Sequence, residues 1–145
     1  MNIMDLEQLQ LEADKDLKIN DTELDLESLR IPALHNKYLK EYTRYKLLLT
    51  RAENDLNTLR REKWEYYTGK SSPETYRLKP FDLKILKTDV DRYIEADIDI
   101  QNTMSKVSYL TTTVDFLERT LRTITNRTFI IKNAIEWRRF TSGAV

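Results

Sequence analysis

Apolar residues recur along most of this chain with the spacing of α-helices that pack against one another. In the second half, a first row of positions runs at intervals of seven from residue 86 to residue 135, and a second row, three residues further on, runs from 89 to 138. Apolar residues fill seven of the eight places in the first row and five of eight in the second. A sustained heptad of this kind predicts helix pairing over residues 81–139, packed most firmly where the second row is unbroken, from Leu110 to Ile131.

The first half of the chain carries a similar helical pattern over residues 33–68. Its two rows, each spaced by seven, are Tyr42, Leu49 and Leu56, and Tyr45, Ala52 and Leu59. Pro32 suits the first turn of this helix. Shorter helical patterns cover residues 4–13 and the stretch after residues 21–23, whereas residues 68–80 hold two of the three Pro residues and predict a connection. The predicted fold is all-α, with long helices in a coiled-coil-like helical bundle.

The last thirty residues have more apolar surface than one chain of this length buries easily. Phe129, Ile130 and Trp137 lie outside the main stripe, and a helix with two apolar faces needs more than one partner. We therefore expect a homo-oligomer. The candidate oligomerisation residues are Val107, Leu110, Val114, Leu117, Leu121, Ile124, Ile131 and Ile135.

The helical stripe of the first half is interrupted at residues 60–70, where four cations and three large aromatic residues gather. Continuing one apolar row reaches Lys63, a charge where the seam requires an apolar side chain, and local rules tend to break at functional sites. Cations beside rings suit a single-stranded nucleic acid, since cations meet phosphates and rings stack on bases. The alternative is that the rings are core and the cations a solvated face. The candidate DNA-binding residues are Arg60, Arg61, Lys63 and Lys70 for phosphates, with Trp64, Tyr66 and Tyr67 for stacking or for bracing the loop.

The formal net charge of zero conceals a segregation of charge along the chain. Residues 1–29 carry a net charge of −7 and residues 30–70 a net charge of +5. The local basic patches therefore permit an anionic ligand. The acidic start has four readings: it folds against the basic segments and neutralises them, contacts a basic partner, shields the DNA site, or serves solubility alone.

Few residues suited to catalysis or to metal binding are available. The chain has no Cys and one His, His35, so we expect no enzyme, no catalytic residues and no cofactor. Gly69-Lys70-Ser71 resembles the end of a phosphate-binding loop, but Trp64 stands where that loop requires glycine. Asp91 and Glu95 share a helix face, yet acids on a solvated face are commoner than a metal site, so no metal is expected. No apolar run approaches the roughly 20 residues of a membrane span, and no secretory signal is visible.

Three stretches of the chain resemble the UvsY family, the recombination mediator proteins of T-even-type bacteriophages. The first is residues 21–39, which run from Asp-Thr-Glu-Leu into Pro-Ala-Leu-His-Asn-Lys-Tyr-Leu. The second and most distinctive is residues 61–70, Arg-Glu-Lys-Trp-Glu-Tyr-Tyr-Thr-Gly-Lys, which looks like the family's basic pair before Tyr-Tyr-[Ser/Thr]-Gly. The third is residues 129–140, which close the last helix.

The resemblance implies a protein that binds single-stranded DNA and helps to load a RecA-like recombinase onto DNA covered by single-strand-binding protein. It also implies a ring-like homo-oligomer of about six to eight subunits, held by the C-terminal helix, in the cytoplasm of the infected bacterial host. The family's basic pair falls on Arg61 and Lys63. Residues 1–80 would then form the DNA-binding part and residues 81–145 the oligomerisation part. The competing hypothesis is a helical assembly or scaffolding protein that binds only protein partners, with residues 60–70 as an intersubunit interface.

Overall fold

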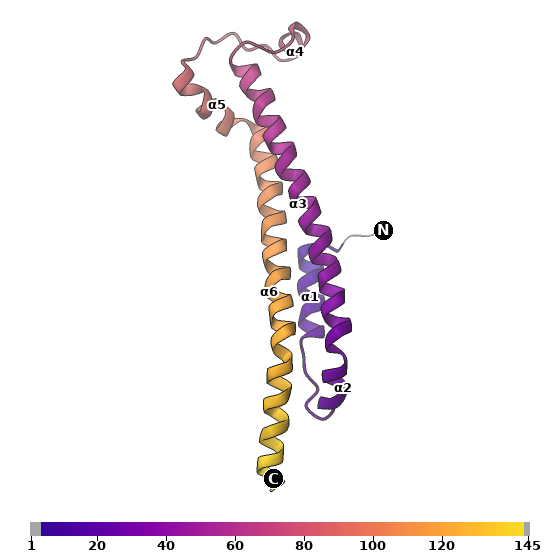
Figure 1. The fold of residues 1–145 in the computed structure, drawn as a ribbon. Coiled ribbons are helices and arrows are strands. Elements are labelled where there is room, and N and C mark those ends of the chain that lie inside the picture. Colours follow the sequence, from indigo (N-terminus) through magenta and orange to yellow (C-terminus); the bar gives the residue numbers. More distant parts are fainter. Residues whose placement is uncertain (1–3, 144–145) are drawn as a thin grey trace. The chain divides into compact units, whose positions relative to one another are not determined.

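The computed structural model describes residues 4–143, and every regular element among them is helical (Figure 1). The all-α fold with long helices is thereby confirmed. None of the helices in this part of the chain combines the length and the hydropathy that crossing a membrane requires. In chain order, the elements are α1 (Leu6–Asp16), α2 (Leu24–Leu29), α3 (Ile31–Tyr67), α4 (Pro73–Leu78), the short 3-10 helix η1 (Lys87–Asp89), α5 (Val90–Ala96) and α6 (Ile98–Thr141).

The chain divides into two compact units. Unit 1 combines Met1–Tyr45 with Thr112–Val145, and unit 2 is Lys46–Thr111. Helices α3 and α6 each contribute residues to both units, so each unit draws on both halves of the sequence. The functional division near residue 80 stays a prediction.

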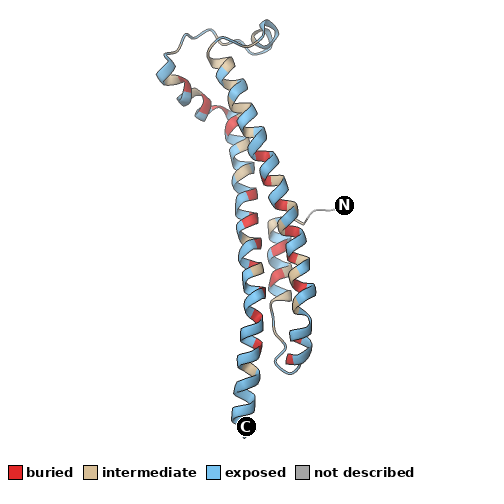
Figure 2. Cartoon of the chain, in the orientation of Figure 1, coloured by how far each residue is buried: buried red, intermediate tan, exposed pale blue. Residues whose placement is uncertain are grey.

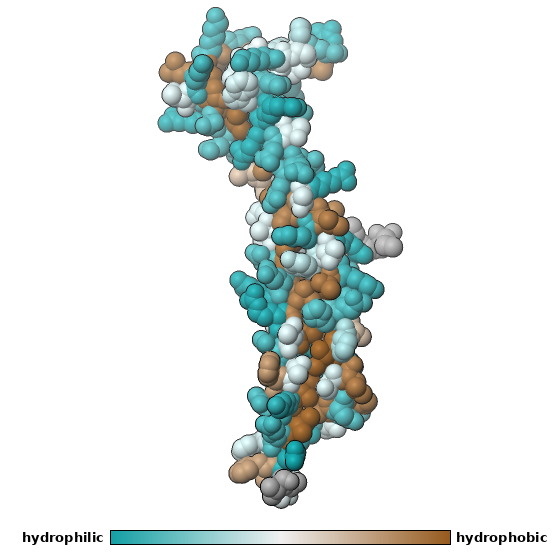
Figure 3. Space-filling model, in the orientation of Figure 1, coloured by the Kyte–Doolittle hydropathy of each residue, from teal (hydrophilic) through white to brown (hydrophobic). Residues whose placement is uncertain are grey.

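Unit 1 is built from α1, α2, the start of α3 and the second part of α6. The second apolar row of α6 lies in its core: Leu117 and Ile124 are 0% exposed and Ile131 is 2% exposed. Figure 2 shows these buried positions along one side of α6, and Figure 3 shows apolar side chains gathering where α1 and α3 face it. The prediction that this half of the heptad packs most firmly is confirmed.

The first apolar row of α6 leaves the core as the helix proceeds. Val114 is buried and Leu121 half-buried, but Thr128 is exposed. Its place is taken by the residue one position earlier, Arg127, which is 1% exposed. The buried face turns in this way because Arg127 hydrogen-bonds to the end of α1 and to α2.

Unit 2 has a small core around α5 and the beginning of α6. Val90, Ile94 and Ile100 are buried, and the partly buried side chains packed against them include Leu56 and Ile85. The prediction of one continuous heptad helix from residue 81 is wrong in this region. Residues 81–86 are irregular, and the helical path breaks between α5 and α6.

Asp97 causes the break between α5 and α6. Its backbone is extended, with φ −67° and ψ 130°. Its carboxylate accepts hydrogen bonds from the N–H groups of Asp99, at 2.9 Å, and Ile100, at 3.3 Å. These are the bonds of an N-cap, which satisfies otherwise unpaired donors in the first turn of a helix. Asp97 therefore starts α6 instead of belonging to a solvated acidic face.

Helix α3 ends in a Schellman motif at Gly69. The Lys70 N–H donates to the Glu65 carbonyl at 2.8 Å, and the Gly69 N–H donates to the Tyr66 carbonyl at 3.3 Å. Gly69 has φ +78°, a conformation that side chains with a Cβ adopt at a cost. The predicted connection over residues 68–80 holds the additional helix α4, capped by Ser72.

Candidate nucleic-acid interface

The end of α3 and the turn that follows it present three cations and one indole ring, which we call the basic face (Arg60, Arg61, Trp64 and Lys70). Arg61, Trp64 and Lys70 are exposed, and Arg60 is half-buried. Arg60 and Arg61 precede Trp64 by four and three residues, which places all three on one side of the helix. Trp64 is 43% exposed. The Lys70 ammonium lies 4.4 Å from the centroid of its ring, within the range of a cation–π interaction.

The two arginines of the basic face are weakly engaged. The Arg61 guanidinium is 4.0 Å from the Glu65 carboxylate, and the Arg61 side chain is 69% exposed. Exposed ion pairs of this kind contribute little to stability. Arg60 contacts the Met104 sulfur at 3.6 Å. Both guanidinium groups can therefore reach an external anion without breaking a strong contact.

Lys63 lies in a different environment from its neighbours on α3. Its ammonium is 2.7 Å from the Asp99 carboxylate and 3.2 Å from that of Asp97, and its side chain is 15% exposed. Burial lowers the pKa of Lys63, but hydrogen bonds from its ammonium to Asp99 and Asp97 outweigh that effect and raise the pKa above its ordinary value. The charge of Lys63 is already balanced within the chain.

Tyr67 completes this polar network. Its hydroxyl donates to the Asp97 carboxylate at 2.7 Å. Burial alone raises the pKa of Asp97, yet the hydrogen bonds from Tyr67 and Lys63 hold it below its ordinary value. Burial and the hydrogen bond to Asp97 raise the pKa of the Tyr67 hydroxyl. Lys63 and Tyr67 thus anchor the end of α3 to the start of α6.

Tyr66 and Tyr67 pack against other rings of the chain. The Tyr66 ring stacks on that of Tyr76, with centroids 5.5 Å apart, and the Tyr67 ring meets Phe81 edge-on at 5.0 Å. Tyr93 adjoins both Tyr67 and Phe81. The Tyr66 hydroxyl also donates to the Lys79 carbonyl at 3.1 Å. The rings of these two tyrosines therefore brace the chain's own packing, whereas Trp64 is exposed; a DNA-binding role of the three residues stays a prediction.

The seven candidate DNA-binding residues therefore separate into two groups. Arg61, Trp64 and Lys70 are exposed and Arg60 is half-buried, while Lys63, Tyr66 and Tyr67 bond to or pack against other groups of unit 2. Sequence reasoning missed Asp97, which bonds to Lys63, Tyr67 and the first turn of α6. The unlike charges of Lys63 and Asp97 were the only available signal, and a separation of 34 residues gives no reason to pair them.

The acidic start of the chain is paired within unit 1. The Lys37 ammonium lies 2.6 Å from the Asp16 carboxylate and 2.8 Å from that of Glu12. Burial raises the pKa of Asp16, but hydrogen bonds from Lys37 and Tyr38 outweigh it and keep the pKa below its usual range. The reading in which acidic residues neutralise basic segments is confirmed for these groups.

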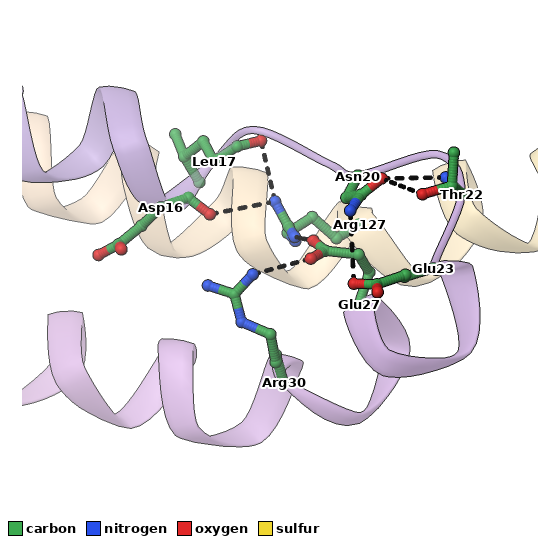
Figure 4. Close-up of polar contacts among 8 residues, drawn as sticks. All are labelled: Asp16, Leu17, Asn20, Thr22, Glu23, Glu27, Arg30 and Arg127. Atoms are coloured by element: carbon green, nitrogen blue, oxygen red, sulfur yellow. Dashed lines mark hydrogen bonds and ion pairs between the residues drawn. The ribbon is translucent and has the colours of Figure 1, made fainter.

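Arg127 and Glu27 form the most deeply buried ion pair of unit 1 (Figure 4). Their charged atoms are 2.7 Å apart, and the side chains are 2% and 6% exposed. Arg127 also donates to the Leu17 carbonyl at 2.9 Å, and Glu27 accepts from Arg30 at 2.8 Å. One arginine of α6 thus ties together the end of α1 and the helix α2.

Most of the candidate oligomerisation residues are covered by the chain's own side chains. Leu110, Val114, Leu117, Ile124 and Ile131 are at most 6% exposed, so they have no surface for a second copy. Val107 and Leu121 are half-buried, and Ile135 is 39% exposed. The heptad packs the monomer because its apolar stripe faces other helices of the same chain. The large apolar side chains left exposed near the end of α6 are Phe129, Ile130, Trp137 and Phe140.

The fold and this site define a class: all-α proteins of long helices in which one helix presents exposed cations around a tryptophan. The chain belongs to the UvsY family, since the family described as "Recombination, repair and ssDNA binding protein UvsY" matches residues 12–144. It is 27% identical to the recombination protein uvsY of Enterobacteria phage T4 over 140 residues, which cover 97% of this chain and 99% of the relative.

Solved structures agree with this assignment. One crystal structure of the bacteriophage T4 recombination mediator protein UvsY superposes with a TM-score of 0.85 at 26% identity, covering 96% of this chain and 98% of that one. A second, in another lattice, gives a TM-score of 0.80 at 25% identity, covering 95% and 99%. The all-α fold is therefore shared with the T4 protein.

Proposed function

We propose that this protein is a non-enzymatic recombination mediator that binds single-stranded DNA without sequence preference. It helps to load a RecA-like recombinase onto DNA covered by single-strand-binding protein. This takes place in the cytoplasm of the infected bacterial host. Family membership supports the role in recombination, repair and single-strand binding. The observation that carries the proposal is the basic face, where exposed cations surround an exposed indole ring.

The basic face suits the backbone of a single strand rather than base edges. Guanidinium and ammonium groups neutralise phosphates, and an indole ring stacks on any base because every base has a π-face. Contacts of these kinds carry no sequence information. Binding should therefore be sequence-independent and should weaken as the salt concentration rises.

A single chain offers few such contacts, so we propose that several copies act together. In a ring-like homo-oligomer, successive basic faces bind one strand, and each further contact becomes intramolecular. The strand is then held along an extended path that single-strand-binding protein no longer covers. The exposed apolar side chains near the end of α6 are the surface through which copies associate.

The test of DNA binding compares the wild-type protein with the triple variant Arg60→Ala/Arg61→Ala/Lys70→Ala. Fluorescence anisotropy of a labelled single-stranded oligonucleotide is measured over a series of salt concentrations. The variant should bind more weakly, and its salt slope should be shallower by about 2, since each lost phosphate contact on a single strand removes about 0.7. The matched control is Lys40→Ala/Lys46→Ala/Lys132→Ala, which removes three exposed lysines elsewhere.

Two outcomes would overturn the proposal. If the triple variant keeps the wild-type affinity and salt slope, the basic face is not the DNA contact. If the wild-type protein binds no oligonucleotide at low salt, the alternative of a scaffold that binds only protein is favoured. Loading is tested separately, by the rate at which a RecA-like recombinase begins DNA-dependent ATP hydrolysis on DNA covered by single-strand-binding protein. Wild-type protein should accelerate it, and the triple variant should not.

A further inference from the structure

A pocket opens beside the basic face, between the end of α3 and the irregular segment before η1. Its volume is about 680 Å³. Trp64 lines it together with three apolar residues, Phe81, Leu83 and Ile85. Leu83 is 63% exposed, so its apolar side chain is accessible to a ligand. The heptad pattern predicts that residues 81–87 belong to a packed helix, and it gives them no role in binding.

The rim of this pocket is basic. Lys70, Lys84 and Lys87 line it, against a single carboxylate, that of Asp82. All three lysine side chains are exposed. None of the ion pairs among residues 4–143 involves them, so their charges are not neutralised within the described chain.

We propose that this pocket receives an unstacked base of single-stranded DNA, which lies against the Trp64 ring while Lys84 and Lys87 hold the flanking phosphates. The inference rests on the proposed function and adds a second segment of the chain to its site. An apolar lining with an indole ring fits the face of a base, and a rim of three lysines against one acid fits the charge of the backbone. The strand thus continues from the basic face of α3 across residues 81–87.

Trp64 is assigned the stacking role on geometric grounds. Tyr66 and Tyr67, the other candidates, have their rings packed against Tyr76 and Phe81 and their hydroxyls bonded to other groups of the chain. The Trp64 ring meets the exposed ammonium of Lys70, which can turn to a phosphate when a base takes its place. Stacking on Trp64 therefore requires no rearrangement of unit 2.

The experiment uses full-length protein with Trp137→Phe, which leaves Trp64 as the single tryptophan and keeps an aromatic ring at position 137. Sedimentation first checks that this variant has the mass of the wild-type protein. The fluorescence of Trp64 is followed during titration with oligodeoxythymidylate and with an abasic oligomer of equal length. Oligodeoxythymidylate should quench Trp64, and the abasic oligomer should not, although its phosphates still bind. Trp64→Ala should lower the affinity for oligodeoxythymidylate roughly 10-fold or more, with little change for the abasic oligomer.

The lysines are tested with Lys84→Ala/Lys87→Ala against Lys46→Ala/Lys106→Ala, two exposed lysines elsewhere in unit 2. The first pair should make the salt slope shallower by roughly 1.4, two phosphate contacts on a single strand, and the second pair should not. If wild-type protein binds the oligomer but Trp64 is not quenched, or the slope stays unchanged in Lys84→Ala/Lys87→Ala, this inference is wrong while the proposed function stands. If wild-type protein binds neither oligomer, the proposed function itself fails.

Discussion

Arg61 and Lys63 lie two residues apart on α3, yet the fold gives their charges different tasks. The Arg61 guanidinium is exposed and only loosely paired. The Lys63 ammonium lies between two carboxylates, one of which caps the first turn of α6. A helix rotates by about 100° per residue, so positions two apart point to opposite sides. The basic pair of the family segment therefore divides, in this chain, into one exposed and one structural cation.

This division predicts that two matched substitutions change the stability by very different amounts. Lys63→Met should lower the free energy of unfolding by about 2 kcal/mol, because it leaves Asp97 without its ionic partner. Arg61→Met should change that free energy by no more than about 0.5 kcal/mol, since it removes an exposed side chain. Urea denaturation of both variants measures the difference. Equal stabilities of the two variants would contradict the structural role of Lys63.

Arg61→Met and Lys63→Met should also differ in how they change the salt dependence of DNA binding. Arg61→Met should make the salt slope shallower by about 0.7, the value for one phosphate contact on a single strand. Lys63→Met should leave the slope unchanged if its ammonium stays with Asp97 and Asp99. If Lys63→Met made the salt slope shallower by as much as Arg61→Met does, the ion pairs of Lys63 with Asp97 and Asp99 would have to open in the complex.

The buried pair of Arg127 and Glu27 predicts a non-additive response. Arg127→Met should destabilise unit 1 by about 3 kcal/mol, because Glu27 then stays buried with less compensation. The double variant Glu27→Gln/Arg127→Met should be more stable than the sum of the single effects implies, since it leaves no unpaired buried charge. Thermal unfolding of the single and double variants tests the coupling. Strict additivity would mean that the two side chains act independently.

At the scale of the elements, the heptad pattern predicted the long helices but not the irregular parts between them. Periodicity records which face of a helix is apolar, and it identified the buried row that contains Leu117, Ile124 and Ile131. It does not record a cap, so the start of α6 at Asp97 was hidden within an acidic run. It also cannot place Arg127 in the core, because its partner Glu27 lies 100 residues away.

The position of the candidate site was predictable from the sequence, but the exposure of its residues was not. The cluster of cations and rings at residues 60–70 was visible because the apolar row fails at Lys63. Which of its members are exposed depends on partners that follow later in the chain, such as Tyr76 and Phe81 for the tyrosines and Asp97 for Lys63. Composition and spacing within α3 carry no information on those partners.

The turn at the end of α3 sets the position of Lys70 beside Trp64. Gly69→Ala should lower the free energy of unfolding by about 1 kcal/mol, because a Cβ disfavours φ near +78°. It should also weaken DNA binding, since Lys70 and the segment after it depend on the same turn. Gly143→Ala is the matched control, because Gly143 has φ +76° and belongs to unit 1, whereas the basic face belongs to unit 2. Equal DNA affinities in the two variants would contradict a role for this turn in the site.

At the scale of the whole molecule, the apolar heptad positions of α6 mainly stabilise the single chain. Most of the candidate oligomerisation residues are buried against other side chains of the same chain. The self-association that we propose would therefore depend on the side chains that the fold leaves uncovered. Near the end of α6 these include Trp137, which is 66% exposed, and Phe140, which is 76% exposed. Their rings lie against each other, with centroids 5.8 Å apart, and form a small apolar surface.

We predict that substitutions in this surface change the mass of the assembled protein in solution. Trp137→Ser/Phe140→Ser should lower the mass measured by sedimentation toward that of one chain, because exposed aromatic residues are frequent anchors of interfaces. Leu11→Ser/Leu78→Ser, which also removes two exposed apolar side chains, should leave the mass unchanged. Repeating the measurement with single-stranded DNA links assembly to function. A variant that no longer assembles should bind DNA more weakly although its basic face is intact, because it has lost the gain from several linked contacts. Full DNA affinity in a monomeric variant would show that one chain suffices for binding.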